Sequence, residues 1–590
     1  MKKLSYFVML VLLGGVSCMF SACSDLLDQE SERVIDANKS HLDNASDTLY
    51  SVVGIMNKMQ ALGDRTILLG ELRGDLVDVT NNTSASLRDI ANFQVGSDNP
   101  YNTPRDYYAV INNCNYFIAK ADTSLKNNRN EKIFLKEYAA VKAFRAWTYL
   151  QLVLNYGKVP FVTTPVLSKD DADYNYEKKD IKGVCEYLIN DIAPLADVEY
   201  PNYGTIRDNN SRLFYFPIYV LLGDLNLWAG NYREAALNYY KYISTRNGRN
   251  SSYPVGMYSV AWNQGDSKWN NFSDSWSTNS FGSWVENVNA NTELISEIPG
   301  DSIPSEGNYS QLKNYFNSNS DNDYKVSIVA SQALKNISQA QRYCHVNAAN
   351  EVVYAPNDLS NDRGGDLRLA ATFKDRSTNF EHNGEKVESY VQNSKYTSRN
   401  IHIYRRAMVY LRMAEALNRA GFPRFAFAIL KTGINNDVMD EEILPYYPDD
   451  EEYLKQFDFP TNRYKLRTRA LNSDENTIGI HSHGTGWAEL NDEYVYPEKE
   501  NLAEEEDAVE DLVINEEALE FAFEGTRFYD LMRVALRRND PSYLANRIYQ
   551  RRGAEQAGVM QGLIGVDLND MNNWYLNWNG QLGLGKEVAK

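Results

Sequence analysis

Cysteine, histidine and long apolar segments are all scarce in this sequence of 590 residues. Beyond residue 16, no apolar run is long enough to cross a bilayer. The five cysteines and six histidines show none of the spacings that bind zinc or build a disulfide framework. Dinucleotide and phosphate-binding fingerprints are also missing. The sequence therefore predicts no metal site, no cofactor and no membrane-spanning helix after the first residues.

Basic residues are outnumbered by acidic ones. The chain has 60 lysines and arginines against 79 aspartates and glutamates, and its formal net charge is −19 at pH 7. Binding of a nucleic acid needs a basic face that neutralises phosphates, whereas an acidic surface repels polyanions. We therefore expect no nucleic acid among the partners of this protein.

The first residues have the pattern of a bacterial lipoprotein signal. Lys2 and Lys3 precede an apolar run over residues 4–16, and the small residues Ser21 and Ala22 stand directly before Cys23. The run is short for a membrane span and is typical of a signal peptide. The pattern predicts cleavage after residue 22 and acylation of Cys23, so that a lipid anchors the chain. The alternative is a secreted protein that is cut nearby and carries an unmodified Cys23.

Apolar residues recur at helical spacing in several segments. Residues 45–62, 105–121 and 137–156 are predicted helices, and the last of these should end at Gly157. Residues 515–538 have the strongest helical pattern, with Asn515 as a potential cap. We expect this segment to be one buried helix, in which Glu524, Arg527, Asp530 and Arg533 pair along the same face.

Two further segments have the pattern of tetratricopeptide helix pairs. Residues 215–243 turn at Gly230, and residues 405–431 turn at Gly421. Because about 150 residues separate them, we do not expect one continuous solenoid. The intervening part, at about 251–400, is rich in Asn, Ser, Gly and Asp and weakly periodic, which is typical of a loop-rich insert laid against the helices.

Several strings, in order along the chain, resemble the SusD/RagB family of outer-membrane nutrient-binding lipoproteins. The clearest is EFAFEGTRFYDLMR at residues 520–533. The others are AFRA at 143–146, YGKVP at 156–160, LRMAEA at 411–416, INNCN at 111–115, the Arg73-Gly74-Asp75 turn, a short strand at 291–299 and the DRGGDLRLAATF segment at 362–373. Their common order makes the resemblance much more specific than one string would.

The resemblance implies a mainly α fold, with four tetratricopeptide-like helix pairs and a loop-rich insert that forms the ligand face. It implies a signal peptide over residues 1–22, an N-terminal helical part over 23–250 and a C-terminal part over 251–590, packed as one compact unit. The implied function is capture of an oligosaccharide at the outer-membrane surface and its delivery to a SusC-like TonB-dependent transporter, without catalysis. The alternatives are a peptide receptor and a surface-anchored glycosidase.

The candidate ligand-binding residues are aromatic. Trp262, Trp269, Trp276 and Trp284 lie within 23 residues of otherwise polar sequence, interleaved with Asn, Gln and Asp. A sugar offers apolar C–H faces and hydroxyls, and it therefore needs flat rings together with amide and carboxylate partners. The alternative is that these rings pin the insert onto the helical body. The resemblance adds a second candidate group, Tyr101, Tyr107 and Tyr108.

Catalytic motifs are absent from the sequence. The nearest approach to a metal or active-site motif is His481-Ser482-His483-Gly484, which we interpret as a glycine-rich loop with incidental histidines, because two ligands without a third make a poor zinc site. Paired carboxylates for glycoside hydrolysis are defined in space, and the sequence leaves that possibility open.

The anchoring hypothesis predicts the behaviour of Cys23→Ala. Without the thiol, no acyl chain can be attached, and the protein should appear in the soluble fraction, while the wild-type protein stays with the membrane. Radiolabelled palmitate feeding followed by fractionation measures both properties. Soluble, unlabelled wild-type protein would exclude the anchor.

Overall fold

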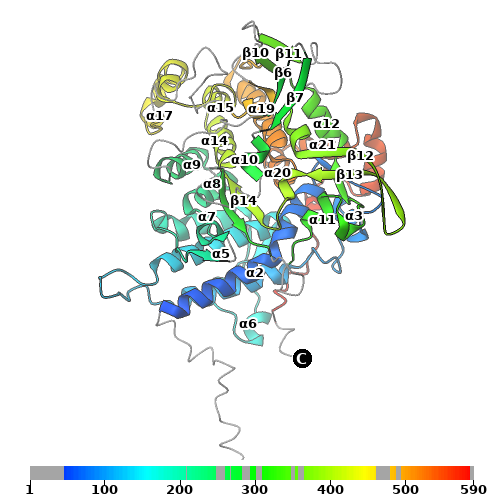
Figure 1. Ribbon diagram of the computed structural model, residues 1–590. Helices are drawn as coiled ribbons and strands as arrows, with labels where there is room; N and C mark the ends of the chain where they lie inside the picture. Colours follow the sequence, from blue (N-terminus) through cyan, green and yellow to red (C-terminus); the bar gives the residue numbers. More distant parts are fainter. Residues whose placement is uncertain are drawn as a thin grey trace, which may run out of the picture.

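The computed structural model describes residues 45–206, 209–246, 260–265, 268–274, 276–281, 293–300, 309–346, 352–355, 365–459, 479–486 and 493–584. The fold is mainly α, as the sequence predicted (Figure 1). The strands in these residues form antiparallel pairs and no larger sheet. One continuous apolar core contains residues from Val52 near the start of the described chain to Leu582 near its end.

The N-terminal part contains three long helices, α2 (Ala45–Leu72), α4 (Pro104–Lys120) and α5 (Leu135–Tyr156). Helix α5 is buried along most of its length and ends at Gly157, which adopts φ +73°, as predicted. Helix α2 is longer than the predicted helix over residues 45–62 and continues to Leu72. Leu68, Leu69 and Leu72 are fully buried, so core packing extends the helix.

Both predicted helix pairs are confirmed. Helices α8 (Ile218–Ala229) and α9 (Tyr232–Arg246) join at Gly230, and α14 (Arg406–Arg419) and α15 (Pro423–Leu430) join around Gly421. Although about 150 residues separate the two pairs in the sequence, α9 packs directly against α14. Helix α7 (Ile181–Ile192) packs between α5 and α8 and extends the stack (Figure 1).

The insert is more regular than predicted in its described residues. Strand β8 (Leu294–Ile298), expected from the sequence, pairs with β14 (Ile401–Arg405). Strands β12 (Phe373–His382) and β13 (Glu385–Asn393) form a long hairpin that projects from the body (Figure 1). Backbone hydrogen bonds between the strands hold this hairpin together. A prediction from the spacing of apolar residues misses it, because most of its residues are polar.

The remaining elements are short. The helices are α3 (Ala85–Ala91), α6 (Lys169–Asp173), α10 (Trp276–Phe281), α11 (Leu312–Phe316), α12 (Gln332–Gln339), α13 (Arg368–Thr372), α16 (Asn436–Val438), α17 (Glu451–Leu454), α18 (Ser482–Thr485), α21 (Ser542–Tyr549) and α22 (Ala557–Ile564). The strands are β1 (Val77–Val79), β2 (Lys158–Pro160), β3 (Lys178–Asp180), β4 (Thr205–Ile206), β5 (Asn209–Asn210), β6 (Val260–Gly265), β7 (Lys268–Asp274), β9 (Ile328–Ala330), β10 (Tyr343–Val346) and β11 (Val352–Ala355).

The predicted single helix over residues 515–538 is wrong. The structure has two helices there, α19 (Leu502–Phe521) and α20 (Arg527–Arg538). Asn501, rather than Asn515, caps α19, because its side chain accepts a hydrogen bond from the backbone N–H of Glu504. Between the helices the backbone enters the left-handed region, which interrupts the helical hydrogen bonds.

The break is held by the end of α2. The carboxylate of Glu71 accepts the backbone N–H groups of Phe523 and Gly525 at 2.7 and 2.9 Å, both of which have positive φ. At Gly70 a Cβ atom would stand only 1.7 Å from the carbonyl oxygen of Gly525. The missing side chain of Gly70 therefore lets α2 approach the break closely enough for Glu71 to satisfy its backbone.

The break also redirects the charged residues that were expected to pair along one helix. Arg527 forms a bidentate pair with Asp75, with Nε–Oδ1 and Nη2–Oδ2 distances of 2.6 and 3.0 Å. Of the expected neighbours, Asp530 and Arg533 do pair, at 2.9 Å. Glu524 instead pairs with Lys395 of the insert and with Arg405 at the end of β14. The interior of the protein is thus joined by ion pairs between segments distant in sequence.

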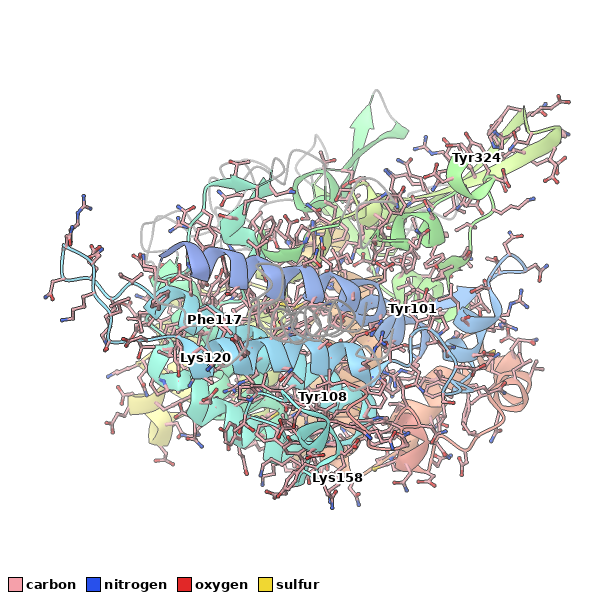
Figure 2. All side chains as sticks on the ribbon, turned by 90° about the horizontal axis from the view of Figure 1, so that it is seen from below. Tyr101, Tyr108, Phe117, Lys120, Lys158 and Tyr324 are labelled. Carbon is pink, nitrogen blue, oxygen red and sulfur yellow. The ribbon has the colours of Figure 1, made fainter. Side chains whose placement is uncertain are left out.

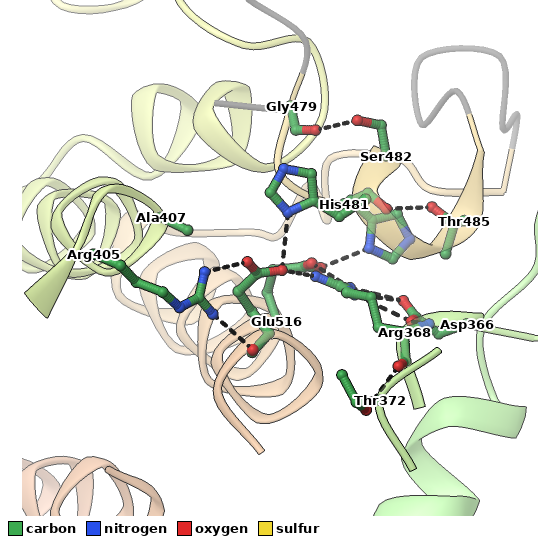
Figure 3. Close-up of polar contacts among 12 residues, drawn as sticks. Asp366, Arg368, Thr372, Arg405, Ala407, Gly479, His481, Ser482, Thr485 and Glu516 are labelled. Atoms are coloured by element: carbon green, nitrogen blue, oxygen red, sulfur yellow. Dashed lines mark hydrogen bonds and ion pairs between the residues drawn. The ribbon is translucent and has the colours of Figure 1, made fainter. Parts of the chain in front are cut away.

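Two arginines lie on opposite sides of the carboxylates of α19 (Figure 3). Arg368 binds Asp366, Glu516 and Glu520 at 2.7, 2.6 and 2.7 Å, and all four side chains are almost fully buried. Arg405 binds Glu520 at 2.7 Å and also contacts Glu524. We call these residues, together with Lys395, His481 and His483, the α19 charge network.

The two histidines of residues 481–484 belong to this network. Nδ1 of His481 lies 2.6 Å from the carboxylate of Glu516, and Nδ1 of His483 lies 2.9 Å from that of Glu520. Both rings are about 1 % exposed. The interpretation as incidental loop histidines was therefore wrong, because their partners come from a helix more than 30 residues away.

Opposite charges decide the protonation of these buried acids. Burial alone would raise the pKa of Glu516, but the charges of Arg368 and His481 outweigh it and hold that pKa at about 2. Burial also raises the pKa of Glu520, but His483 and Arg405 outweigh this effect and hold that pKa well below its usual range. Glu516 and Glu520 therefore stay ionised at neutral pH.

Gly70→Ala should unfold the junction between α2 and the break. The new methyl group would collide with the backbone of Gly525, which cannot rotate away, so we expect a loss of about 3 kcal/mol or more of stability. Gly54→Ala, on the same helix, is the matched control: a Cβ there meets no atom within 4 Å, and alanine should stabilise the protein by about 0.5–1 kcal/mol. Denaturant melts of both variants measure this difference. Equal stabilities of the Gly70→Ala and Gly54→Ala variants would contradict the close approach of α2 to Gly525.

Acid should destabilise the protein partly through Glu516. Its folded pKa of about 2 lies below the ordinary value of 4.5, so its stabilising contribution is complete above about pH 4.5 and is lost as the pH falls towards 2. The contribution amounts to about 3 kcal/mol. Chemical denaturation over this pH range should give a flatter profile for Glu516→Gln than for the wild type. The exposed Glu504→Gln on the same helix should leave the slope unchanged, and an unchanged slope for Glu516→Gln as well would refute the assignment.

Candidate ligand-binding site

An aromatic hairpin is the leading candidate for ligand contact. Strands β6 and β7 form it, and they lie beside β10 and β11 at the top of the view in Figure 1. The base of β6 packs against α18, the short helix that carries His483 of the charge network. The hairpin thus starts from a part of the protein that buried ion pairs hold in place.

The register of the hairpin brings aromatic and amide positions together. Trp262 is the register partner of Phe272, and Gln264 is the partner of Trp269. The register shifts after Asn263, which adds one residue to β7 and marks a β-bulge. Flat rings interleaved with amides are the groups that bind the C–H faces and hydroxyls of a sugar.

Trp276 follows the hairpin in the sequence and is buried. It begins α10 and is 1 % exposed, with its ring centroid 6.1 Å from that of His483. Lys395 Nζ lies 5.6 Å from the Trp276 ring and 4.9 Å from the Phe281 ring. The prediction that Trp276 contacts a ligand is thus corrected: its ring is used in packing, as the alternative interpretation held for this residue.

The two aromatic rings of α10, Trp276 and Phe281, pack against the buried Lys395. Its ammonium group donates to the backbone carbonyl of Glu520 at 2.8 Å and pairs with Glu524. Burial lowers its pKa, and the charge of Glu524 opposes this effect. Trp276 and Phe281 cover the buried ammonium group and attract it through their π faces. Helix α10 therefore anchors the hairpin to the charge network.

The tyrosine group is largely internal. Tyr101 precedes α4 and Tyr108 lies on it (Figure 2). Tyr107 and Tyr108 are 0 % and 1 % exposed, and the hydroxyl of Tyr108 donates to the carbonyl of Pro160 at 2.7 Å. These two rings are therefore removed from the set that a ligand can reach. Tyr101 is half-buried, and its hydroxyl lies 3.1 Å from that of Tyr315.

The remaining predicted positions divide into two groups. Trp262 and Trp269 lie in the paired strands of the hairpin, whereas Trp284 lies outside the described residues. Sequence reasoning missed Lys395, which carries no local signal because its partners come from α10 and α19. Arg368 did stand in a string that was singled out, at residues 362–373, and Arg405 opens the helix-pair segment 405–431. Arginines at such positions were the available signal for a buried network.

Neither a metal site nor a membrane-spanning helix appears in the part of the chain that the structure describes. No three His, Cys, Asp or Glu side chains there are grouped to hold a metal ion. The helices in the same residues are too short or too polar to cross a bilayer.

Comparison with known proteins identifies the family. The model of the SusD family matches residues 238–562. A curated relative, SusD-like protein P2 of Formosa agariphila, is 29 % identical over 179 residues, which are 29 % of this chain and 33 % of the relative. The match thus spans about a third of the length of that relative.

Solved structures share the fold. A SusD superfamily protein of Bacteroides thetaiotaomicron has a TM-score of 0.51 and 15 % identity, with 83 % of this chain and 89 % of that chain covered. A putative sugar binding protein of Bacteroides vulgatus has a TM-score of 0.52 and 16 % identity, with 84 % of this chain and 88 % of that chain covered. A SusD-like protein of Bacteroides fragilis has a TM-score of 0.52 and 15 % identity, with 86 % of this chain and 88 % of that chain covered. Because the family model matches more than half of the sequence, this chain belongs to the SusD family.

Proposed function

We propose that this protein binds an oligosaccharide at the cell surface, with the β6–β7 hairpin as the main contact. The observation that carries the proposal is the register of the hairpin, which places Trp262, Phe272 and Trp269 among amide residues. Aromatic rings supply area for stacking, and amides supply both donors and acceptors for hydroxyl groups. The anchored base of the hairpin favours binding, because a preorganised site loses less conformational entropy.

The protein acts by binding and transfer rather than by turnover. A glycosidase needs two carboxylates that flank an open cleft. The carboxylates of Glu516, Glu520 and Glu524 are buried and paired with cations, which makes them unsuitable as a general acid or nucleophile. A bound glycan would then pass unchanged to a SusC-like TonB-dependent transporter in the outer membrane, beside which the lipid on Cys23 would hold the protein.

Glycan screening tests the function directly. The mature protein is applied to a glycan array, and each glycan that binds is then incubated with the protein and assayed for reducing ends. We expect at least one retained oligosaccharide and no release of reducing ends above background. Turnover would favour the glycosidase alternative, and retention of peptides alone would favour the peptide receptor.

Alanine substitutions separate the hairpin from its anchor. Trp262→Ala or Trp269→Ala should weaken binding of the array-selected glycan by about thirtyfold, or about 2 kcal/mol, because a stacking surface is lost. The melting temperature should change little. Trp276→Ala is the matched contrast and should cost about 3–5 kcal/mol of stability, because a buried ring leaves a cavity over Lys395. Calorimetric titration beside thermal melting measures both, and full affinity in both hairpin variants would place the site elsewhere.

A further inference from the structure

A second aromatic surface lies on the helix-pair side of the molecule. A groove of about 360 Å³ opens between the turn that joins α8 to α9, the start of α7, helix α20 and the C-terminal tail. Figure 1 shows α7 and α8 on the left of the view, below α9 and away from the β6–β7 hairpin at the top. The groove and the hairpin are thus separate places on the protein.

Three rings line this groove. Trp228, Tyr232 and Tyr575 are half-buried, and each has a polar tip, an indole N–H or a hydroxyl. No described residue forms a hydrogen bond with any of these three tips. Half-buried donors and acceptors without protein partners must be satisfied by water or by a ligand. The groove therefore combines flat apolar surface with polar groups that are ready to bind.

The ring of Tyr575 is held in a defined position. Its carbon atoms lie 3.0–3.1 Å from the point where Gly157 would carry a Cβ, so only glycine lets the ring sit there. On either side of Tyr575 the tail is fixed: the indole N–H of Trp574 donates to the carbonyl of Leu568 at 2.7 Å, and the backbone N–H of Leu576 donates to the carbonyl of Asn155 at 2.9 Å. Such preorganisation reduces the entropic cost of stacking.

The inner arginine of the groove is already neutralised. The guanidinium carbon of Arg533 lies 5.3 Å from the centroid of the Trp228 ring. Arg533 also forms a bidentate pair with Glu415 at 2.6 and 2.9 Å and binds Asp530 at 2.9 Å. It therefore orients the indole and has no charge left for an anionic ligand.

The rim of the groove carries charged side chains. Arg537 binds Asp507 at 2.8 Å, the exposed Lys182 lies 3.9 Å from the carboxylate of Glu186, and the carboxylate of Asp180 caps α7 by accepting the N–H of Gly183 at 2.9 Å. Inside this rim, the three rings offer a ligand aromatic surface and neutral hydrogen-bonding tips. Those are the groups that recognise a neutral pyranose, and the volume suits a small ligand of this kind.

We infer that this groove is a second carbohydrate-binding subsite, selective for a neutral pyranose unit, at which Trp228 and Tyr575 stack and Tyr232 provides a hydrogen bond. The inference rests on the proposed function for the class of ligand. Its geometry is independent of the hairpin. A glycan held at two separated subsites dissociates more slowly than one held at either alone, because release requires both contacts to open.

Fluorine NMR tests the groove while reporting on the hairpin. The mature protein is labelled with 5-fluorotryptophan, and the resonances of Trp228, Trp262 and Trp269 are assigned with single Trp→Phe variants. The probes are methyl β-D-glucopyranoside and methyl α-D-mannopyranoside, with sodium glucuronate as the anionic comparison. We expect the Trp228 resonance to shift saturably with at least one neutral probe, with a Kd on the order of millimolar.

Substitutions of tyrosine supply the controls. Tyr575→Ala should weaken the response of Trp228 by about three- to tenfold, and Tyr575→Phe, which retains the ring, should weaken it less. Tyr187→Ala is the matched control, since Tyr187 is an exposed tyrosine on α7 that does not line the groove. It should leave the response unchanged. Thermal melting of each variant checks that the fold is retained.

The outcomes distinguish this inference from the proposed function. If the hairpin resonances shift with the neutral probes and that of Trp228 does not, the groove is not a subsite, although the hairpin function stands. A Trp228 shift without hairpin shifts supports the groove and removes the hairpin as the main contact. No shift at any of the three overturns both. A response of Trp228 to glucuronate alone overturns the selectivity for neutral sugars.

Discussion

The burial of carboxylates on one face of α19 is the constraint on which the rest of the structure depends. An unpaired buried carboxylate costs several kcal/mol, and a buried pair is tolerated only when its geometry and hydrogen bonds are complete. Glu516 and Glu520 on the helix, and Glu524 just beyond its end, meet this condition with Arg368 and Lys395 of the insert and with Arg405 of β14. The segments that supply the cations must therefore reach α19 together. This requirement gives a weakly apolar insert a fixed place on a helical body.

The same constraint explains how a polar hairpin acquires a rigid base. Lys395 is buried beside Glu524, and its ammonium group needs cover that does not compete for the carboxylate. Trp276 and Phe281 provide it, since aromatic faces attract a cation without accepting a full hydrogen bond. Packing of α10 on the network therefore holds the part of the chain that follows β7.

Local patterns predicted the fold well wherever the deciding contacts are local. The helices at 105–121 and 137–156, the stop at Gly157 and the turns of both helix pairs follow from spacing and from glycine. The break after α19 could not be predicted, because Glu71 and Gly70, about 450 residues earlier, decide it. The tryptophans show the same limit. Their clustering was visible, but only tertiary contacts separate Trp276, which packs, from positions in the hairpin.

The polar tips of aromatic rings meet different partners in the core and in the groove. In the core, Tyr108 donates its hydroxyl to a backbone carbonyl and Trp574 donates its indole N–H to another, so burial costs neither group a hydrogen bond. Trp228, Tyr232 and Tyr575 are half-buried without such partners among the described residues. A ligand that brings its own hydroxyl groups can therefore bind these tips without breaking a hydrogen bond within the protein.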